Sequence, residues 1–154
     1  MTLDEVFQQK FAEWRPESAG QTLTIDHPAS GWTAAVTAER VESLGCQLRE
    51  VVLTRSAPLT TGDSLADQAR RIANRVTGLL EPLRLVEADT EHGLVQLRSS
   101  SPAQRGESVQ YYEVLRRANG TTRLGRFESQ PGTAVRARPC RIDSVKALEH
   151  ALSF

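Results

Sequence analysis

The segment 109–128 constrains the fold of this chain more than any other part of the sequence. It reads VQYYEVLRRANGTTRLGRFE, and it places Asn119-Gly120 between two runs in which apolar and polar side chains alternate. Asn and Gly tolerate the positive φ angles of a two-residue type I′ turn, and alternation with a period of two is typical of a half-buried strand. The segment therefore predicts a β-hairpin in which Ala118 faces Thr121.

The predicted turn also sets the register of this hairpin. Arg116 and Arg123 then oppose each other, and like charges at opposed positions repel unless water or an anion separates them. These two arginines are therefore a candidate anion-binding site, and a solvated hairpin tip is the alternative. The other opposed pairs are Leu115 with Leu124, Glu113 with Arg126, Tyr112 with Phe127, and Val114 with Gly125.

Elsewhere, hydrophobic periodicity predicts strands in runs, with helices before, between and after them. A first amphipathic helix covers Leu3 to Trp14, a second covers Ser64 to Leu80 with Asp67 completing a capping arrangement, and a last one covers Ser144 to Leu152. A polar loop is expected at 100–107. Further strands are predicted at 21–26, 32–42, 47–55, 83–88 and 93–99, with an edge strand at 135–142. Strands in runs favour a twisted antiparallel sheet with helices packed on it, which is an α+β domain.

Length and composition bound the number of domains and the class of protein. The chain has 154 residues and no internal linker, so we expect one domain over 1–154. The helix in 1–16 is either peripheral, packed on a second copy or a partner, or packed on its own domain. No apolar run is long enough to span a membrane. The 19 basic and 19 acidic residues balance, which argues against a nucleic-acid partner. The start of the chain carries acidic residues and lacks the features of a secretory signal, and the expected location is the cytoplasm.

The sequence contains no motif of a catalytic or cofactor site. There is no GxSxG elbow, P-loop, GxGxxG turn, HExxH helix or EF-hand loop. Cys46 and Cys140 lie in strand-like runs without metal-ligand spacing, and no two of the three histidines have that spacing either. We therefore predict no catalytic residues, no metal and no cofactor, with both cysteines as buried thiols. A nucleophilic Cys-His pair assembled in space is the alternative.

Several short motifs lie along the chain from Thr22 onward. They are HPASGW at 27–32, LTR at 53–55 followed by TGDSL at 61–65, and the closing SF at 153–154. In this order they resemble the PsbP/DcrB-like superfamily, with its Pro-x-Gly-Trp turn after the first strand, its Gly-x-x-Leu entry to a central helix, and the end of its last helix. The amphipathic helix before Trp14 is not part of that pattern.

The resemblance implies a binding protein rather than an enzyme. Members of the superfamily are mostly non-enzymatic, and its cytosolic branch includes chaperones that hold the membrane segments of type VI secretion effectors. With no catalytic motif present, this predicts a bacterial cytosolic adaptor or secretion chaperone that holds a peptide or helix of a protein partner, alone or as a homodimer. Type III secretion chaperones, also small α+β proteins with a leading helix, are similar. Aromatic residues anchor interfaces, and the expected partner-binding residues are Phe11, Trp14, Trp32, Tyr111, Tyr112 and Phe127.

A second hypothesis is a protein with a small-ligand cavity, or a small enzyme. In this case the sheet and the helix after Ser64 enclose a pocket lined by arginines such as Arg55, Arg98 and Arg116, whose guanidinium groups bind carboxylates and phosphates. A deep pocket with an apolar wall and a thiol or histidine inside it favours the cavity. A shallow exposed apolar groove favours the partner-binding protein.

Overall fold

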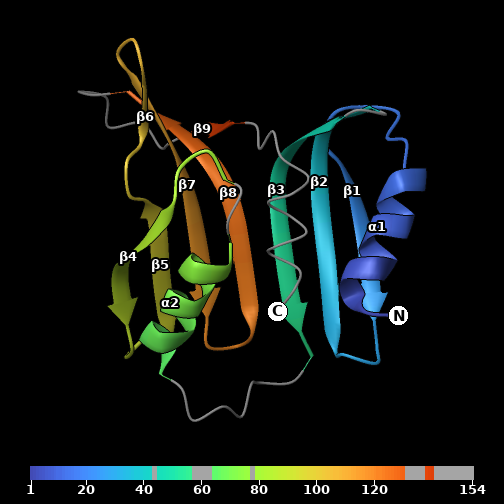
Figure 1. The fold of residues 1–154 in the computed structure, drawn as a ribbon, viewed down its shortest axis with the longest axis horizontal. Coiled ribbons are helices and arrows are strands. Elements are labelled where there is room, and N and C mark those ends of the chain that lie inside the picture. The colour runs from blue at the N-terminus through green and yellow to red at the C-terminus, as the bar shows by residue number, and fades with distance from the viewer. Residues whose placement is uncertain (43–44, 57–63, 77–78, 131–137, 141–154) are drawn as a thin grey trace.

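The chain forms one antiparallel sheet with two helices in the residues that the structure describes. The structure is a computed structural model that describes residues 1–42, 45–56, 64–76, 79–130 and 138–140. The helices are α1 (Leu3–Glu13) and α2 (Leu65–Arg75). The strands are β1 (Gln21–His27), β2 (Trp32–Glu42), β3 (Gly45–Arg55), β4 (Leu83–Asp89), β5 (Leu94–Ser99), β6 (Ala103–Arg105), β7 (Ser108–Arg117), β8 (Thr121–Ser129) and β9 (Arg138–Cys140). Their order in the sheet is β1-β2-β3-β8-β7-β5-β4, with β6 paired to β7 and β9 paired to β8 (Figure 1).

This architecture confirms the predicted α+β class and the antiparallel sheet. The five strands predicted between residues 21 and 99 match β1 to β5 to within two residues at each end. One short strand, β6, lies in the predicted loop, and β9 falls within the predicted edge strand 135–142. The predicted helix 144–152 lies outside the described residues. Within the described residues, no helix is long and apolar enough to cross a membrane.

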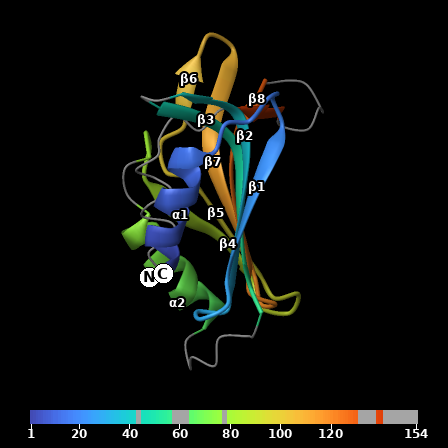
Figure 2. The same ribbon diagram turned by 90° about the vertical axis from the view of Figure 1, so that its right-hand side faces the viewer.

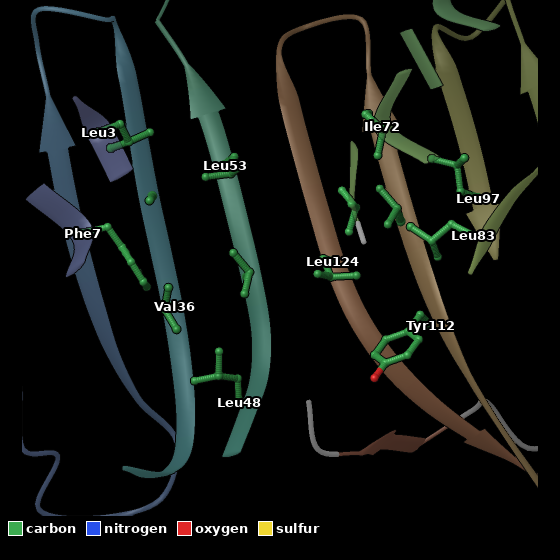
Figure 3. Packing of buried hydrophobic residues seen from close by; sticks show 14 of the residues in the cluster. Leu3, Phe7, Val36, Leu48, Leu53, Ile72, Leu83, Leu97, Tyr112 and Leu124 are labelled. Atoms are coloured by element: carbon green, nitrogen blue, oxygen red, sulfur yellow. The ribbon is translucent and has the colours of Figure 1, made fainter. Parts of the chain in front are cut away.

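Both helices lie on the same face of the sheet (Figure 2). We call this face the inner face and the opposite one the outer face. Helix α1 contacts β1, whereas α2 contacts β4 and β5, so the two helices lie over different halves of the sheet. The buried side chains of the inner face and of the helices form one hydrophobic core (Figure 3), whose labelled members are Leu3, Phe7, Val36, Leu48, Leu53, Ile72, Leu83, Leu97, Tyr112 and Leu124.

Helix α1 is stabilised both by its cap and by burial. The Thr2 hydroxyl accepts a hydrogen bond from the Glu5 N–H at 3.3 Å, and the Glu5 carboxylate accepts one from the Thr2 N–H at 2.8 Å. These bonds to Thr2 lower the pKa of Glu5 below its ordinary value. Phe7 is 1% exposed and its ring stacks on Phe11 at 5.2 Å. Because Leu3 and Phe11 are also buried, α1 contributes to the same core as the strands.

Helix α2 begins as predicted but ends earlier. The Ser64 hydroxyl accepts from the Asp67 N–H at 3.1 Å and donates to the Asp67 carboxylate at 2.9 Å, which is the expected cap. The helix ends at Arg75 rather than at Leu80, and Leu80 is 70% exposed. The sequence offers a reason, because Thr and Gly follow Val76 and both have low helix propensity.

The β7–β8 hairpin forms, but its predicted register is wrong by one residue. The Gly120 N–H donates to the Arg117 carbonyl at 3.1 Å, and Gly120 has a φ of 93°. No described residue other than glycine has a positive φ, so Asn119 does not adopt the type I′ conformation. The connection is instead a type I turn followed by a left-handed glycine, which adds one residue to the loop.

This shift changes which side chains share a face. Arg116 pairs with Thr122, and Leu115 pairs with Arg123, so the predicted opposition of Arg116 and Arg123 does not form. Because successive side chains of a strand point to opposite faces, Arg116 lies on the buried inner face and Arg123 on the exposed outer face. The other observed pairs are Tyr111 with Phe127, Tyr112 with Arg126, Glu113 with Gly125, and Val114 with Leu124.

Candidate functional site

The aromatic residues predicted to bind a partner are distributed over three places. Phe11 and Tyr112 are in the core, at 8% and 0% exposed, and neither reaches a partner without a rearrangement. Trp14 is partly buried at the end of α1, with its ring 5.9 Å from that of Phe11. Tyr111 and Phe127 stack at 6.0 Å on the outer face. The structure therefore does not assemble these residues into one surface.

The sixth predicted aromatic residue, Trp32, lines a pocket on the inner face. The pocket has a volume of about 70 Å³ and lies between α2 and strands β2, β3, β7 and β8. We call it the Arg116 pocket. It is lined by Trp32, Leu53 and Ile72, by Gln68 and Thr122, and by Arg71, Arg75 and Arg116.

Arg116 is the most constrained charged group of this pocket. Because side chains alternate between the two faces along β7, the Arg116 side chain points to the inner face, where the residue is only 6% exposed. Its Nη1 donates to Thr122 Oγ1 at 2.7 Å, its Nη2 lies 3.4 Å from Gln68 Oε1, and its Nε is buried without an acceptor. No Asp or Glu of the described residues forms an ion pair with it. Among the described residues, Arg116 is therefore a buried cation without a counter-ion.

The electrostatic surroundings of Arg116 oppose its charge. Burial lowers the pKa of the Arg116 guanidinium below its ordinary value, and the nearby charge of Arg55 lowers it further. The guanidinium of Arg55 itself lies 5.6 Å from the centre of the Trp32 ring, at the same end of the sheet. An anion in the Arg116 pocket would relieve both effects, because it supplies a counter-charge and hydrogen-bond acceptors.

The second buried arginine of the inner face, Arg126, has a carboxylate counter-ion. Arg126 is 3% exposed, and its Nη1 donates to both carboxylate oxygens of Glu81, at 3.1 and 3.2 Å. Its guanidinium also lies 4.3 Å from the centre of the Tyr112 ring. Glu81 follows α2, so this pair fastens the segment after the helix to β8. We assign Arg126 a structural role.

The charged residues that line a depression on the outer face, Arg49, Glu50, Glu113 and Arg123, each form an ion pair. This depression has a volume of about 300 Å³ and lies over strands β3, β7 and β8. Arg123 pairs with Glu50 at 3.0 Å, and Arg98 pairs with Glu113 at 3.1 Å. Arg98 was predicted to line a cavity together with Arg55 and Arg116, but it is exposed and lies near Tyr111, at 5.2 Å from the ring centre. Among its described lining residues, this depression has no buried charge without a partner.

Metal and nucleophile chemistry has no support in the described part of the chain. No group of three or more His, Cys, Asp or Glu side chains there is placed to hold a metal. Cys46 is buried at 7% exposed, and the side chain of Cys140 lies outside the described residues. The His27 ring contacts Ser30 Oγ at 2.7 Å, and the His92 ring contacts Asp89 at 2.7 Å. Among the described lining residues of the Arg116 pocket there is neither a thiol nor a histidine.

The sequence pointed to Arg116 but missed its neighbours on α2. Gln68, Arg71 and Arg75 have the spacing i, i+3 and i+7, which places three side chains on one side of a helix. That spacing is visible in the sequence, beside the apolar stripe that contains Ile72. Which strands this side of the helix faces follows only from the packing.

The chain was also compared with known proteins. No protein-family model, curated protein or solved structure matches the chain. The resemblance to the PsbP/DcrB-like superfamily therefore stays a prediction. The evidence for the candidate site is the geometry described above.

Proposed function

We propose that this protein is a non-enzymatic binding protein whose Arg116 pocket receives an anionic group of its ligand. The observation that carries the proposal is Arg116 itself, which is buried and, within the part of the chain that the structure describes, has no carboxylate partner and retains an Nε–H without an acceptor. Removing an ion from water costs several kcal/mol, and buried charges are usually paired. An anion bound beside Arg116 would supply the missing counter-ion.

The dimensions of the pocket indicate how much of a ligand it takes. Sites for drug-sized molecules usually measure about 300–1,000 Å³, whereas this pocket measures about 70 Å³. It therefore accommodates an anionic head group, and the rest of the ligand lies outside. The apolar wall formed by Trp32, Leu53 and Ile72 keeps the head group away from water, which strengthens its attraction to Arg116.

The same site suits the predicted cytosolic adaptor or secretion chaperone. A partner peptide or helix carries acidic groups that fit such an anchor, and Trp32 lies beside it. In this proposal both helices pack on the inner face, and the ligand binds next to α2. A small carboxylate or phosphate ligand is the alternative, and it uses the same arginine.

The replacement Arg116→Met should abolish stabilisation of the protein by anions. A ligand that binds only the native state stabilises it by RT ln(1 + [L]/Kd), which is about 2.7 kcal/mol at 100 times Kd. We therefore expect the melting temperature of the wild-type protein to rise with the concentration of acetate, phosphate or sulfate until it saturates. Chloride at the same ionic strength is the reference salt. The measurement is thermal unfolding followed by fluorescence or circular dichroism.

Arg123→Met is the matched control for this experiment. It removes the same charge from the same hairpin but on the outer face, where Arg123 pairs with Glu50. Its response to anions should equal that of the wild type. The proposal is wrong if no anion stabilises the wild-type protein, or if the Arg116→Met variant responds like the wild type.

A further inference from the structure

The Arg116 pocket carries more positive charge than one carboxylate neutralises. Arg71 and Arg75 line it from α2, Arg116 lines it from β7, and none of its described lining residues is acidic. Arg55 on β3 adds a further positive charge close enough to act on Arg116. Arg75, Arg116 and Arg55 alone therefore place more than one positive charge at the described pocket.

The pocket also offers hydrogen-bond donors in excess of acceptors. Arg116 keeps one N–H that has no acceptor among the described residues. Thr122 Oγ1 accepts from Arg116 at 2.7 Å, so its own hydroxyl hydrogen points elsewhere and is a further donor. Gln68 Oε1 is the one side-chain acceptor that the described residues set against the other nitrogens of Arg116, and it lies at 3.4 Å. A ligand with several acceptor oxygens matches this set.

We propose that the group bound in the Arg116 pocket is a phosphate monoester in its dianionic form. This inference rests on the proposed function of the pocket and makes it more specific. A phosphate monoester carries a charge of about −1.5 to −2 at pH 7 and three strong acceptor oxygens, whereas a carboxylate carries one charge and two oxygens. Guanidinium groups recognise phosphate through paired donors, and a second arginine at the rim balances the second charge.

The phosphate monoester can belong to a phosphorylated side chain of a partner protein or to a small phosphorylated molecule. Clusters of arginines recognise phosphorylated motifs in proteins. The small volume of the pocket takes the phosphate and little else, so the chemistry that it recognises is the same for both sources.

The test uses methyl phosphate, sulfate and acetate as probes, with binding measured by calorimetry or by thermal shift. The second pKa of a phosphate monoester is about 6, so raising the pH from about 5 to about 7.5 converts the monoanion to the dianion and should tighten its binding about tenfold. Sulfate is a dianion throughout and should bind with unchanged affinity. The facing charged groups in the described pocket are Arg71 and Arg75 from α2, Arg55 from β3 and Arg116 from β7, and arginines do not titrate in this range.

Substitutions make the outcome specific to the site. Arg75→Gln should weaken the binding of methyl phosphate more than the binding of acetate. Arg116→Met should abolish the binding of both probes, and Arg123→Met should change the affinity for neither. Acetate binding as tight as methyl phosphate binding, without the pH dependence, overturns the phosphate assignment and leaves the proposed function standing. Absence of binding for all three probes, or binding that persists in the Arg116→Met variant, overturns the proposed function itself.

Two further probes separate the sources of the phosphate. A phosphoserine peptide with apolar flanking residues is compared with its unphosphorylated form and with methyl phosphate. Much tighter binding of the phosphopeptide than of methyl phosphate identifies a phosphorylated partner, and equal affinity identifies a small phosphorylated ligand. Equal binding of the phosphorylated and unphosphorylated peptides contradicts the inference.

Discussion

The replacement Arg126→Met should lower the free energy of unfolding by about 3–5 kcal/mol, because it leaves a buried carboxylate without its counter-ion. Glu81 is 7% exposed, and both of its oxygens accept from Arg126. The variant also loses the contact of the guanidinium with the Tyr112 ring. Urea denaturation followed by fluorescence measures the change, with the m-value as the check that both proteins unfold in two states.

The same replacement at Arg116 should have the opposite effect. Arg116→Met removes a buried charge that has no carboxylate partner in the described part of the chain, so no described carboxylate is left unpaired, and the stability without ligand should be equal to or higher than that of the wild type. Both arginines lie on the inner face of the β7–β8 hairpin, which makes them a matched pair. If Arg116→Met destabilises the protein as strongly as Arg126→Met, Arg116 is a structural residue and the proposed anion site loses its basis.

The second large effect is expected in α1. Phe7→Ala should lower the free energy of unfolding by about 3–5 kcal/mol, because it removes a fully buried ring and leaves a cavity beside Phe11. Gln9→Ala, an exposed position of the same helix, should change stability by at most about 0.5 kcal/mol. Chemical denaturation of both variants gives the comparison.

This experiment also tests how α1 is held. A short helix is marginal in isolation, so its stability comes from the surface on which it packs. If Phe7→Ala leaves stability unchanged but dissociates an oligomer in light scattering, α1 packs on a second copy rather than on its own sheet. Deletion of residues 1–16 should likewise lower the melting temperature of the remaining chain, because it exposes the strand side chains that Leu3, Phe7 and Phe11 cover.

The strands of this fold are predictable from local sequence, whereas the register of the hairpin is not. Alternation places β1 to β5 closely, because each strand has one buried face. The dipeptide Asn119-Gly120 suits both a type I′ turn and a type I turn with a following left-handed glycine, and these differ by one residue in the loop. In the observed register Tyr112 and Arg126 share the inner face, where Arg126 pairs with Glu81, which is 45 residues away in sequence. Local sequence does not contain such a contact.

The candidate site was predictable in part for a related reason. Arg116 stands out in the sequence because it lies among other arginines near a turn. Its surroundings come from four other elements, and the residues of α2 that line the pocket reach it only through the packing of that helix on the sheet. Local pattern does not specify such contacts, because they join segments that are far apart in the chain.

The order of the strands has a consequence for how this chain folds. β1, β2 and β3 form one meander of neighbouring strands, and β4, β5, β7 and β8 form a second. The β3–β8 pairing joins them across 75 residues of sequence, from Glu50 to Gly125. Closing such a long loop is entropically costly and usually slow, so we expect the two meanders to form first and to join last. The Arg116 pocket takes Leu53 from one meander and Thr122 from the other. A ligand in it therefore holds the two halves of the chain together and should slow their separation during unfolding.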